Sequence, residues 1–148
     1  MTPARENFDL LCHAGQISGP ADDVDIERAE AELGVRFPEE YRDLLRACGA
    51  VLASGVSVYG LPKAENNDPP LWQDVVAVTT QLREWEQVGT EHHSLIAISE
   101  DGFGNYFYLD TSRSPETRIW AVGPGVHKVF DTSLFKFLLE LSEGKLAV

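Results

Sequence analysis

Cysteine is scarce in this chain, and several familiar catalytic motifs are missing. The two cysteines, Cys12 and Cys48, form no CxxC motif, and neither GxSxG nor HExxH occurs. Free cysteine is among the most buried residue types, so we predict that both thiols lie in the core. The sequence therefore favours a protein that is not an enzyme. An enzyme that pairs Cys12 or Cys48 with a histidine remains an alternative, which requires an exposed, activated thiol.

Long apolar runs are also absent. No segment approaches the roughly 20 apolar residues that a membrane-spanning helix needs. The first residues, MTPARENFDLLCHAG, lack the basic start and the apolar run of about 7–15 residues that mark a secretory signal. We therefore expect a cytoplasmic protein, and the low cysteine content agrees with that location.

Positive charge is the third scarcity. The 148 residues include 12 Lys and Arg against 24 Asp and Glu, a formal net charge of −12 at pH 7. Such a field repels nucleic acid and acidic membrane surfaces, so we expect neither as a partner. It attracts a basic protein. The alternative is that the charge serves solubility alone.

The hydrophobic pattern predicts one α+β domain over 1–148, with a core at about 24–141 and an N-terminal extension over 1–22. Consecutive strands with short turns pair antiparallel, so we expect a sheet of about four to six strands with helices packed on it. The expected helices lie within 8–13, 24–34, 38–48, 75–87 and 133–144, and the expected strands at 56–61, 94–99, 105–110, 118–122 and 127–130.

The second and third helices carry the clearest local signals. Asp25 is the expected N-cap of the first of them, and Gly34 stands where a left-handed residue ends a helix. Pro38 suits the first position of the next helix. Tyr41 and Leu44 begin its apolar stripe, so the pair is expected to be two amphipathic helices joined by a tight turn.

The stretch EDGFGNYFYLD, residues 100–110, carries acids and glycines that suggest a ligand loop. Calcium loops need acids at alternate positions and flanking helices, whereas here Asp101 is followed at once by Gly102. Phosphate loops need a helix N-terminus after the glycines, whereas a strand follows here. A β-hairpin explains the pattern best, with Gly102 and Gly104 in its turn. Strand alternation places Tyr106 and Tyr108 on one face, which we expect to be exposed.

Histidine offers no metal site in this pattern. His92 and His93 are adjacent, so their side chains diverge in either a helix or a strand. His13 and His127 have no Cys, Asp or Glu at zinc-like spacing. We predict that the protein binds no metal and no cofactor.

The segment IERAEAELGVRFPEEYRDLLRACGA resembles the opening signature of the SUKH superfamily. LIAISEDGFGNYFYLD is similar to the strand–turn–strand of that family, and TSLFKFLLEL is similar to its closing helix. The resemblance runs from about Val24 to Leu141. It departs at Cys48, where the family usually has Asn before the glycine. The resemblance implies an α+β fold whose motif residues shape the fold and perform no catalysis: Glu30, Leu33, Gly34, Pro38, Tyr41, Leu44, Gly102 and Gly104.

The resemblance also implies a role in protein binding. Many SUKH proteins are bacterial immunity proteins that bind and block a toxin domain, often a nuclease or deaminase, and a related yeast protein regulates cell-wall synthesis. The first hypothesis is therefore neutralisation of a basic cognate toxin C-terminal domain by a monomer or weak dimer. The alternative is a non-catalytic regulatory or scaffold protein that binds a host protein.

Two surfaces are candidates for that contact. The preferred one combines aromatic anchors with acids, as protein interfaces often do: Asp68, Trp72, Glu100, Asp101, Tyr106, Tyr108 and Asp110. The other is an acidic belt on the two helices and the loop before them: Asp22, Asp23, Asp25, Glu27, Glu39, Glu40 and Asp43.

Overall fold

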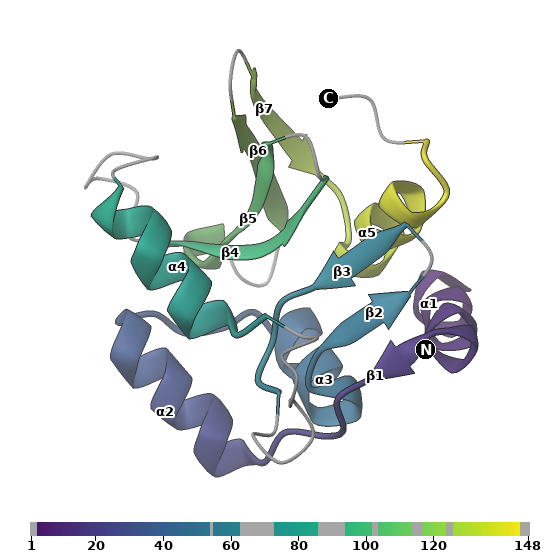
Figure 1. The fold of residues 1–148 in the computed structure, drawn as a ribbon, viewed down its shortest axis with the longest axis horizontal. Helices are drawn as coiled ribbons and strands as arrows, with labels where there is room; N and C mark the ends of the chain where they lie inside the picture. Colours follow the sequence, from purple (N-terminus) through teal and green to yellow (C-terminus); the bar gives the residue numbers. More distant parts are fainter. Residues whose placement is uncertain are drawn as a thin grey trace.

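The computed structural model describes residues 3–53, 55–62, 73–85, 94–101, 104–113, 117–123 and 126–145. Figure 1 shows helices on both sides of two small sheets. In chain order the elements are α1 (Pro3–Ala14), β1 (Gln16–Ile17), α2 (Asp23–Leu33), α3 (Glu39–Cys48), β2 (Val51–Ala53), β3 (Val56–Val58), α4 (Val75–Glu84), β4 (Leu95–Glu100), β5 (Tyr106–Asp110), the 3-10 turn η3 (Thr111–Arg113), β6 (Arg118–Gly123), β7 (Val126–Asp131) and α5 (Leu134–Ser142).

The predicted α+β fold with antiparallel strands is confirmed. The strands form one sheet in the order β1-β2-β3 and a second in the order β4-β5-β6-β7, and every neighbouring pair is antiparallel. Strands β1 and β2 were not expected from the sequence. Each has only two or three residues, which is too short for an alternating pattern to be seen.

The two sheets meet where β3 ends beside the middle of β4. The Tyr59 backbone N–H donates to the Ile98 carbonyl at 2.7 Å, and the Ser99 hydroxyl donates to the Ser57 carbonyl at 2.6 Å. The register of β4 against β5 shifts between Ala97 and Ser99. A bulge of this kind bends a strand, and here it accompanies the junction between the sheets.

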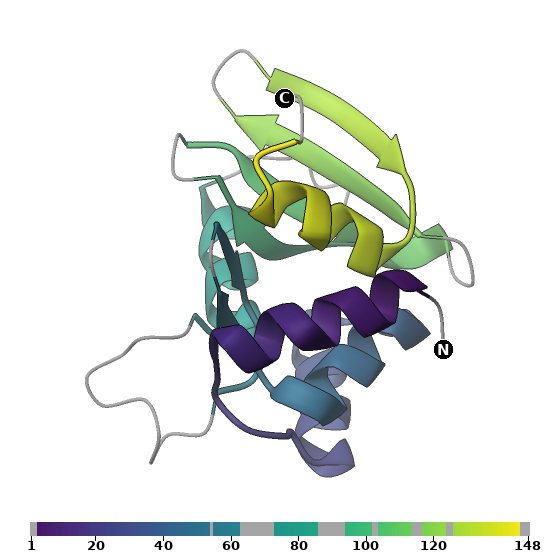
Figure 2. The same ribbon diagram turned by 90° about the vertical axis from the view of Figure 1, so that its right-hand side faces the viewer.

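Helices cover both faces of the larger sheet. On one side, Phe137 of α5 packs edge-on against Phe107 of β5, with ring centroids 5.1 Å apart. On the other side, the Thr79 hydroxyl of α4 accepts a hydrogen bond from the Ala97 N–H of β4 at 2.9 Å. Figure 2 shows α1 and α5 side by side on the face turned toward the viewer. The larger sheet therefore lies between helices on its two faces.

Helix α1 contributes to the same buried cluster as the rest of the fold. Phe8 is buried and contacts the Phe135 ring of α5, with a centroid distance of 5.4 Å. Cys12 and Cys48 are both buried, as the sequence predicted. The division into a core at about 24–141 and an extension at 1–22 stays a prediction, although α1 packs on the core through these contacts.

The α2–α3 helix pair agrees with the sequence prediction at the turn between the helices, but α2 begins earlier than expected. Gly34 ends α2 with φ 71° and ψ 31°, which confirms the predicted helix stop. The N-cap of α2 is Asp22, so the prediction of Asp25 is wrong by three positions. The Ala21 N–H donates to the Leu45 carbonyl of α3 at 2.9 Å, and this tertiary contact sets where the helix begins. Pro38 is the N-cap residue of α3, one position before the expected site.

Candidate protein-binding surface

The turn between β4 and β5 is a hairpin turn closed by its own side chains. The Asp101 carboxylate accepts hydrogen bonds from the Asn105 side-chain amide at 2.7 Å and from the Asn105 backbone N–H at 3.3 Å. Gly104 has φ 92°. The predicted hairpin is confirmed by the antiparallel pairing of Glu100 with Tyr106. The Asp101 carboxylate thus organises the turn.

Only part of the preferred surface set is exposed. Glu100 is exposed, and Asp101 and Tyr106 are half-buried. Tyr108 and Asp110 are buried, with exposed fractions of 1% and 5%. The expectation that the Tyr106–Tyr108 face is exposed is therefore wrong for Tyr108. The physical reason is that helices pack on both faces of the larger sheet, which alternation along one strand cannot reveal.

Asp110 has a structural role in the interior. Its carboxylate accepts hydrogen bonds from the Ser112 N–H at 3.0 Å, the Ser112 hydroxyl at 2.6 Å, the Ser94 hydroxyl at 3.2 Å and the Trp120 indole N–H at 3.3 Å. Burial raises the pKa of this carboxyl, but the hydrogen bonds led by Ser112 outweigh it and leave the pKa below its usual value. Asp110 holds the η3 turn against β4 and β6 and is not available to a partner.

Two residues of the preferred surface, Asp68 and Trp72, lie outside the described residues, as does Gly102 of the predicted turn. Glu100, Asp101 and Tyr106 are accessible, and their role in partner binding stays a prediction.

An exposed tryptophan, Trp85, lies near the accessible residue Tyr106 of the preferred surface. Trp85 caps the C-terminal end of α4 with 67% of its surface exposed. It lines a groove of about 270 Å³ with Val78, Leu82 and Tyr106, so the groove lies between α4 and β5. The sequence analysis placed Trp85 with Val78 and Leu82 on one side of the helix without marking it as an anchor. Helical spacing groups these residues, but only the tertiary packing buries Leu82 and leaves Trp85 accessible.

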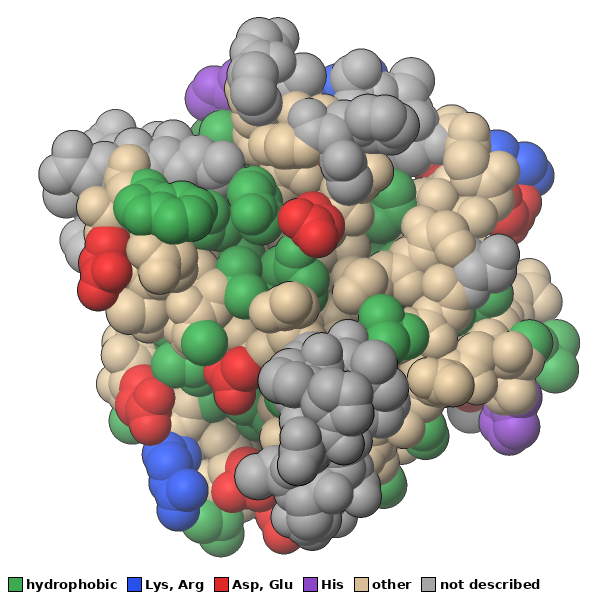
Figure 3. All heavy atoms as spheres, in the orientation of Figure 1, with side chains coloured by type: hydrophobic (Ala, Val, Ile, Leu, Met, Phe, Trp, Pro, Cys, Tyr) green, Lys and Arg blue, Asp and Glu red, His purple; other side chains and the backbone are tan. Residues whose placement is uncertain are grey.

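A second groove lies on the other side of α4, against α2. Its volume is about 800 Å³, and its walls carry four carboxylates and the Arg28 guanidinium. Ala77 of α4 lines both this groove and the apolar one. Figure 3 shows apolar and acidic side chains gathered side by side over α4 and α2, with little positive charge between them.

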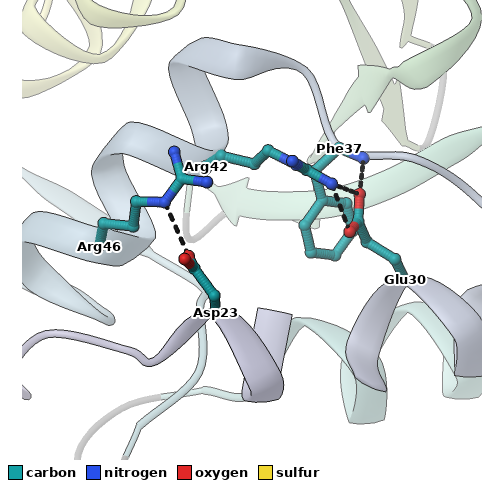
Figure 4. A network of polar contacts seen from close by, with 5 residues as sticks. All are labelled: Asp23, Glu30, Phe37, Arg42 and Arg46. Atoms are coloured by element: carbon teal, nitrogen blue, oxygen red, sulfur yellow. Dashed lines mark hydrogen bonds and ion pairs between the residues drawn. The ribbon is translucent and has the colours of Figure 1, made fainter. Parts of the chain in front are cut away.

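Part of the acidic belt on α2 and α3 is engaged within the fold, through Asp23, Glu40 and Asp43. Figure 4 shows Arg46 reaching Asp23 and Arg42 reaching Glu30, so two arginines of α3 bind two acids of α2. The Glu40 carboxylate of α3 accepts hydrogen bonds from the Thr117 hydroxyl at 2.6 Å and the Leu134 N–H at 3.3 Å. Glu27 and Glu39 are exposed.

The residues predicted to shape the fold, Gly102 apart, lie at interior or turning positions in the described structure. Tyr41 is fully buried, and its hydroxyl donates to the Tyr59 carbonyl at 2.6 Å. Leu33 and Leu44 are buried. Glu30 is 8% exposed and binds both Arg42 and the Phe37 N–H. These contacts join α2, α3 and the end of β3.

The described part of the chain contains no group of three or more His, Cys, Asp and Glu side chains placed to hold a metal ion. His92 and His93 lie outside it. The His127 ring rests on Trp120 with centroids 5.3 Å apart, and His13 Nδ1 lies 2.7 Å from the Asp9 carbonyl oxygen. None of the described helices has the length and apolar character needed to cross a lipid bilayer.

Comparison with known families assigns the chain. The SUKH_6 family model, described as SMI1-KNR4 cell-wall, matches residues 23–138, which is most of the sequence. No curated protein is significantly similar to the chain. Membership is consistent with toxin immunity or with an SMI1-KNR4-like role, and both roles rest on a protein partner. The matched span includes the α2–α3 turn, both sheets from β2 onward and most of α5, and the chain belongs to the SUKH superfamily.

Proposed function

We propose that this protein is a cytoplasmic immunity protein that binds and neutralises the toxin domain of a bacterial competition system. The observation that carries the proposal is the SUKH family match over residues 23–138. The proposed role needs no catalytic residues, no cofactor and no metal. It needs a stable surface that fits the toxin and blocks its work.

The charge of the chain supports a nucleic-acid-targeting toxin as the partner. Enzymes that act on nucleic acid carry Lys and Arg to hold phosphates, and this chain has a net charge of −12. Opposite fields speed the encounter of two proteins, to about 10⁸ M⁻¹s⁻¹ at low salt. Protection against a lethal enzyme calls for a Kd of about 1 nM or tighter, which corresponds to roughly −12 kcal/mol.

A second candidate role is a regulatory or scaffold function on a host protein. The description of the matching family model, SMI1-KNR4 cell-wall, is the observation that favours it. This role predicts binding to a housekeeping protein and no protection from any toxin. The two roles therefore differ in partner and in phenotype.

The decisive experiment uses the C-terminal domain encoded by the reading frame directly upstream of this one. That domain is purified and titrated with the full-length protein by calorimetry, and its activity is assayed in parallel. A tight 1:1 complex that also abolishes the activity supports immunity. Co-expression in bacteria is then expected to restore growth that the domain alone prevents.

A negative result in this experiment favours the regulatory or scaffold role. Without heat, inhibition or rescue, the immunity proposal fails. Capture from the native lysate, followed by identification of a stoichiometric housekeeping partner, then tests the scaffold role.

A further inference from the structure

We propose that α4 is the recognition ridge of this protein and that it receives one basic amphipathic segment of the toxin domain. The apolar residues of that segment fill the groove between α4 and β5. Its Lys or Arg residues enter the acidic groove between α4 and α2. This inference rests on the proposed function and adds the surface and the chemistry of the partner.

The apolar half of the ridge has the character of an interface anchor. Trp85 exposes 67% of its surface, although a large aromatic side chain normally gains free energy from burial. Beside it, Val78, Leu82 and Tyr106 line the groove of about 270 Å³. Interface hot spots are enriched in Trp and Tyr beside well-packed pockets. A single Leu- or Phe-sized side chain of a partner fits a groove of this kind.

The acidic half carries charge that the fold leaves largely unneutralised. Among the described residues, Asp25 and Glu32 of α2 and the N-cap residues Asp22 and Asp74 share the groove with one cation, Arg28, which lies 4.0 Å from Asp25. Asp74 is committed to the fold, because its carboxylate caps α4 by accepting from the Val76 and Ala77 N–H groups at 2.8 and 3.1 Å. The α2 carboxylates remain to attract a cationic partner.

The two grooves belong to one surface because Ala77 lines both of them. Ala77 is an exposed residue of α4, and its small side chain is the boundary between the two grooves. A helix or loop of the partner that crosses α4 at Ala77 can place apolar side chains in the α4–β5 groove and cations in the α4–α2 groove. That pattern is the one an amphipathic basic segment presents.

Matched variants of the full-length protein test the acidic half with the adjacent toxin domain. Glu32→Lys changes the groove, whereas Glu27→Lys makes the same charge change on an exposed α2 position outside the groove. We expect Glu32→Lys to weaken binding by about tenfold or more at low salt, and Glu27→Lys by about twofold. Equal effects of the two variants would overturn the inference, because the net charge of the protein, and not the groove, would then account for the attraction.

The apolar half has its own matched pair. Trp85→Ala removes the proposed anchor, and Leu10→Ala removes a side chain of α1 with a similar exposed fraction, 69%. We expect Trp85→Ala to weaken binding by about 30-fold or more and Leu10→Ala to leave it unchanged. If wild-type protein binds and protects while both variants bind equally well, the proposed function stands and the ridge is wrong.

A measurement without the toxin keeps the inference open to refutation if that domain does not bind. A synthetic helical peptide of about 18 Leu and Lys residues is titrated into ¹⁵N-labelled protein and followed by NMR. We expect shift changes at Ala77, at the Trp85 indole and along the facing side of α2, and none with the matching Leu and Glu peptide. Changes centred on α1 or α3, or the absence of any change, would overturn the ridge.

Discussion

Arg42 holds the Glu30 carboxylate with a single guanidinium nitrogen, Nη2, which lies 2.6 and 2.9 Å from its two oxygens. The Phe37 backbone N–H donates to the same carboxylate at 2.6 Å. Glu30 belongs to α2, Arg42 to α3, and Phe37 to the turn between them. One buried carboxylate therefore fixes the angle between two helices and the path of the chain that joins them (Figure 4).

Replacing Glu30 by Gln is expected to destabilise the protein. The change leaves the partly buried Arg42 without its counter-charge, and breaking such a pair costs about 2–4 kcal/mol. Urea unfolding followed by circular dichroism measures it. Asp23→Asn is the matched control, because the Asp23–Arg46 pair joins the same helices with both side chains exposed to water. A similar loss from both variants would contradict the assigned role of Glu30.

Two glycines with positive φ are expected to differ sharply in their response to alanine. Gly34 has φ 71° and open space around the added Cβ, so Gly34→Ala carries only the strain of about 1–2 kcal/mol for that conformation. Gly49 has φ 76°, and a Cβ there would collide with the carbonyl oxygen of Gly19. Gly49→Ala is therefore expected to lower the melting temperature much further than Gly34→Ala. Equal shifts in thermal unfolding would show that the Gly19 contact does not constrain this turn.

Tyr41→Phe probes the buried hydroxyl that joins α3 to the end of β3. At neutral pH the loss of its hydrogen bond to the Tyr59 carbonyl is expected to cost about 1–2 kcal/mol. Burial, with the charge of Asp74 adding to it, raises the pKa of Tyr41 well above its usual value. The unfolded chain loses this proton near pH 10 while the folded protein keeps it, so stability falls as the pH rises above about 10.

The difference between wild type and Tyr41→Phe is therefore expected to narrow in alkali. Urea midpoints at about pH 8 and about pH 11 measure it. Tyr106→Phe, at the half-buried tyrosine of the α4–β5 groove, is the control and is expected to change stability little. A difference that stays constant across this range would refute the assigned shift of Tyr41.

Asp110→Asn is expected to lose its difference in stability from wild type at low pH, whereas Tyr41→Phe loses its difference at high pH. The depressed pKa of Asp110 in the folded protein adds stability above its unfolded pKa of about 4, and this contribution is lost as the pH falls through the folded value. At neutral pH the variant is expected to lose about 1–3 kcal/mol. The gap to wild type then closes on acidification, as urea midpoints at about pH 7 and about pH 3 will show. Glu84→Gln, an exposed carboxylate of α4, is the control and should give no gap.

Thiol labelling tests the alternative of a cysteine enzyme. Cys12 and Cys48 are both buried, with exposed fractions of 8% and 5%. We expect neither thiol to react with an aromatic disulfide reagent until the protein is unfolded in urea. Rapid labelling of one thiol in the native protein would revive the enzyme hypothesis.

The local signals of the sequence were sufficient where a short segment determines its own structure. Gly34 ends α2 as expected, because a left-handed residue without a Cβ is needed there. The Asp101–Asn105 turn closes with contacts only four residues apart. The apolar stripe that begins at Tyr41 and Leu44 is buried as its 3.6-residue spacing indicated. In each case the interaction is local, so its residues can be read in order.

The candidate surface could not be derived in the same way. Tyr108 and Asp110 have the residue types of an interface, but both are buried, and Asp110 is held by Ser94, Ser112 and Trp120. Trp85 shares a helical side with Leu82, yet Leu82 is buried and Trp85 is exposed. The two grooves need α2, α4 and β5 to lie beside one another, and these elements are far apart along the chain.

The sequence by itself determined the α+β class, the helix pair with its glycine stop, the hairpin, the excess of acid and the family resemblance, because each depends on composition or on neighbours along the chain. Only the tertiary structure decided which aromatic side chains reach solvent and which carboxylates form hydrogen bonds or ion pairs within the protein. Exposure and pairing depend on contacts between distant segments, such as Glu40 with Thr117 and Leu134. No local pattern records those contacts, because they form only when the chain has packed.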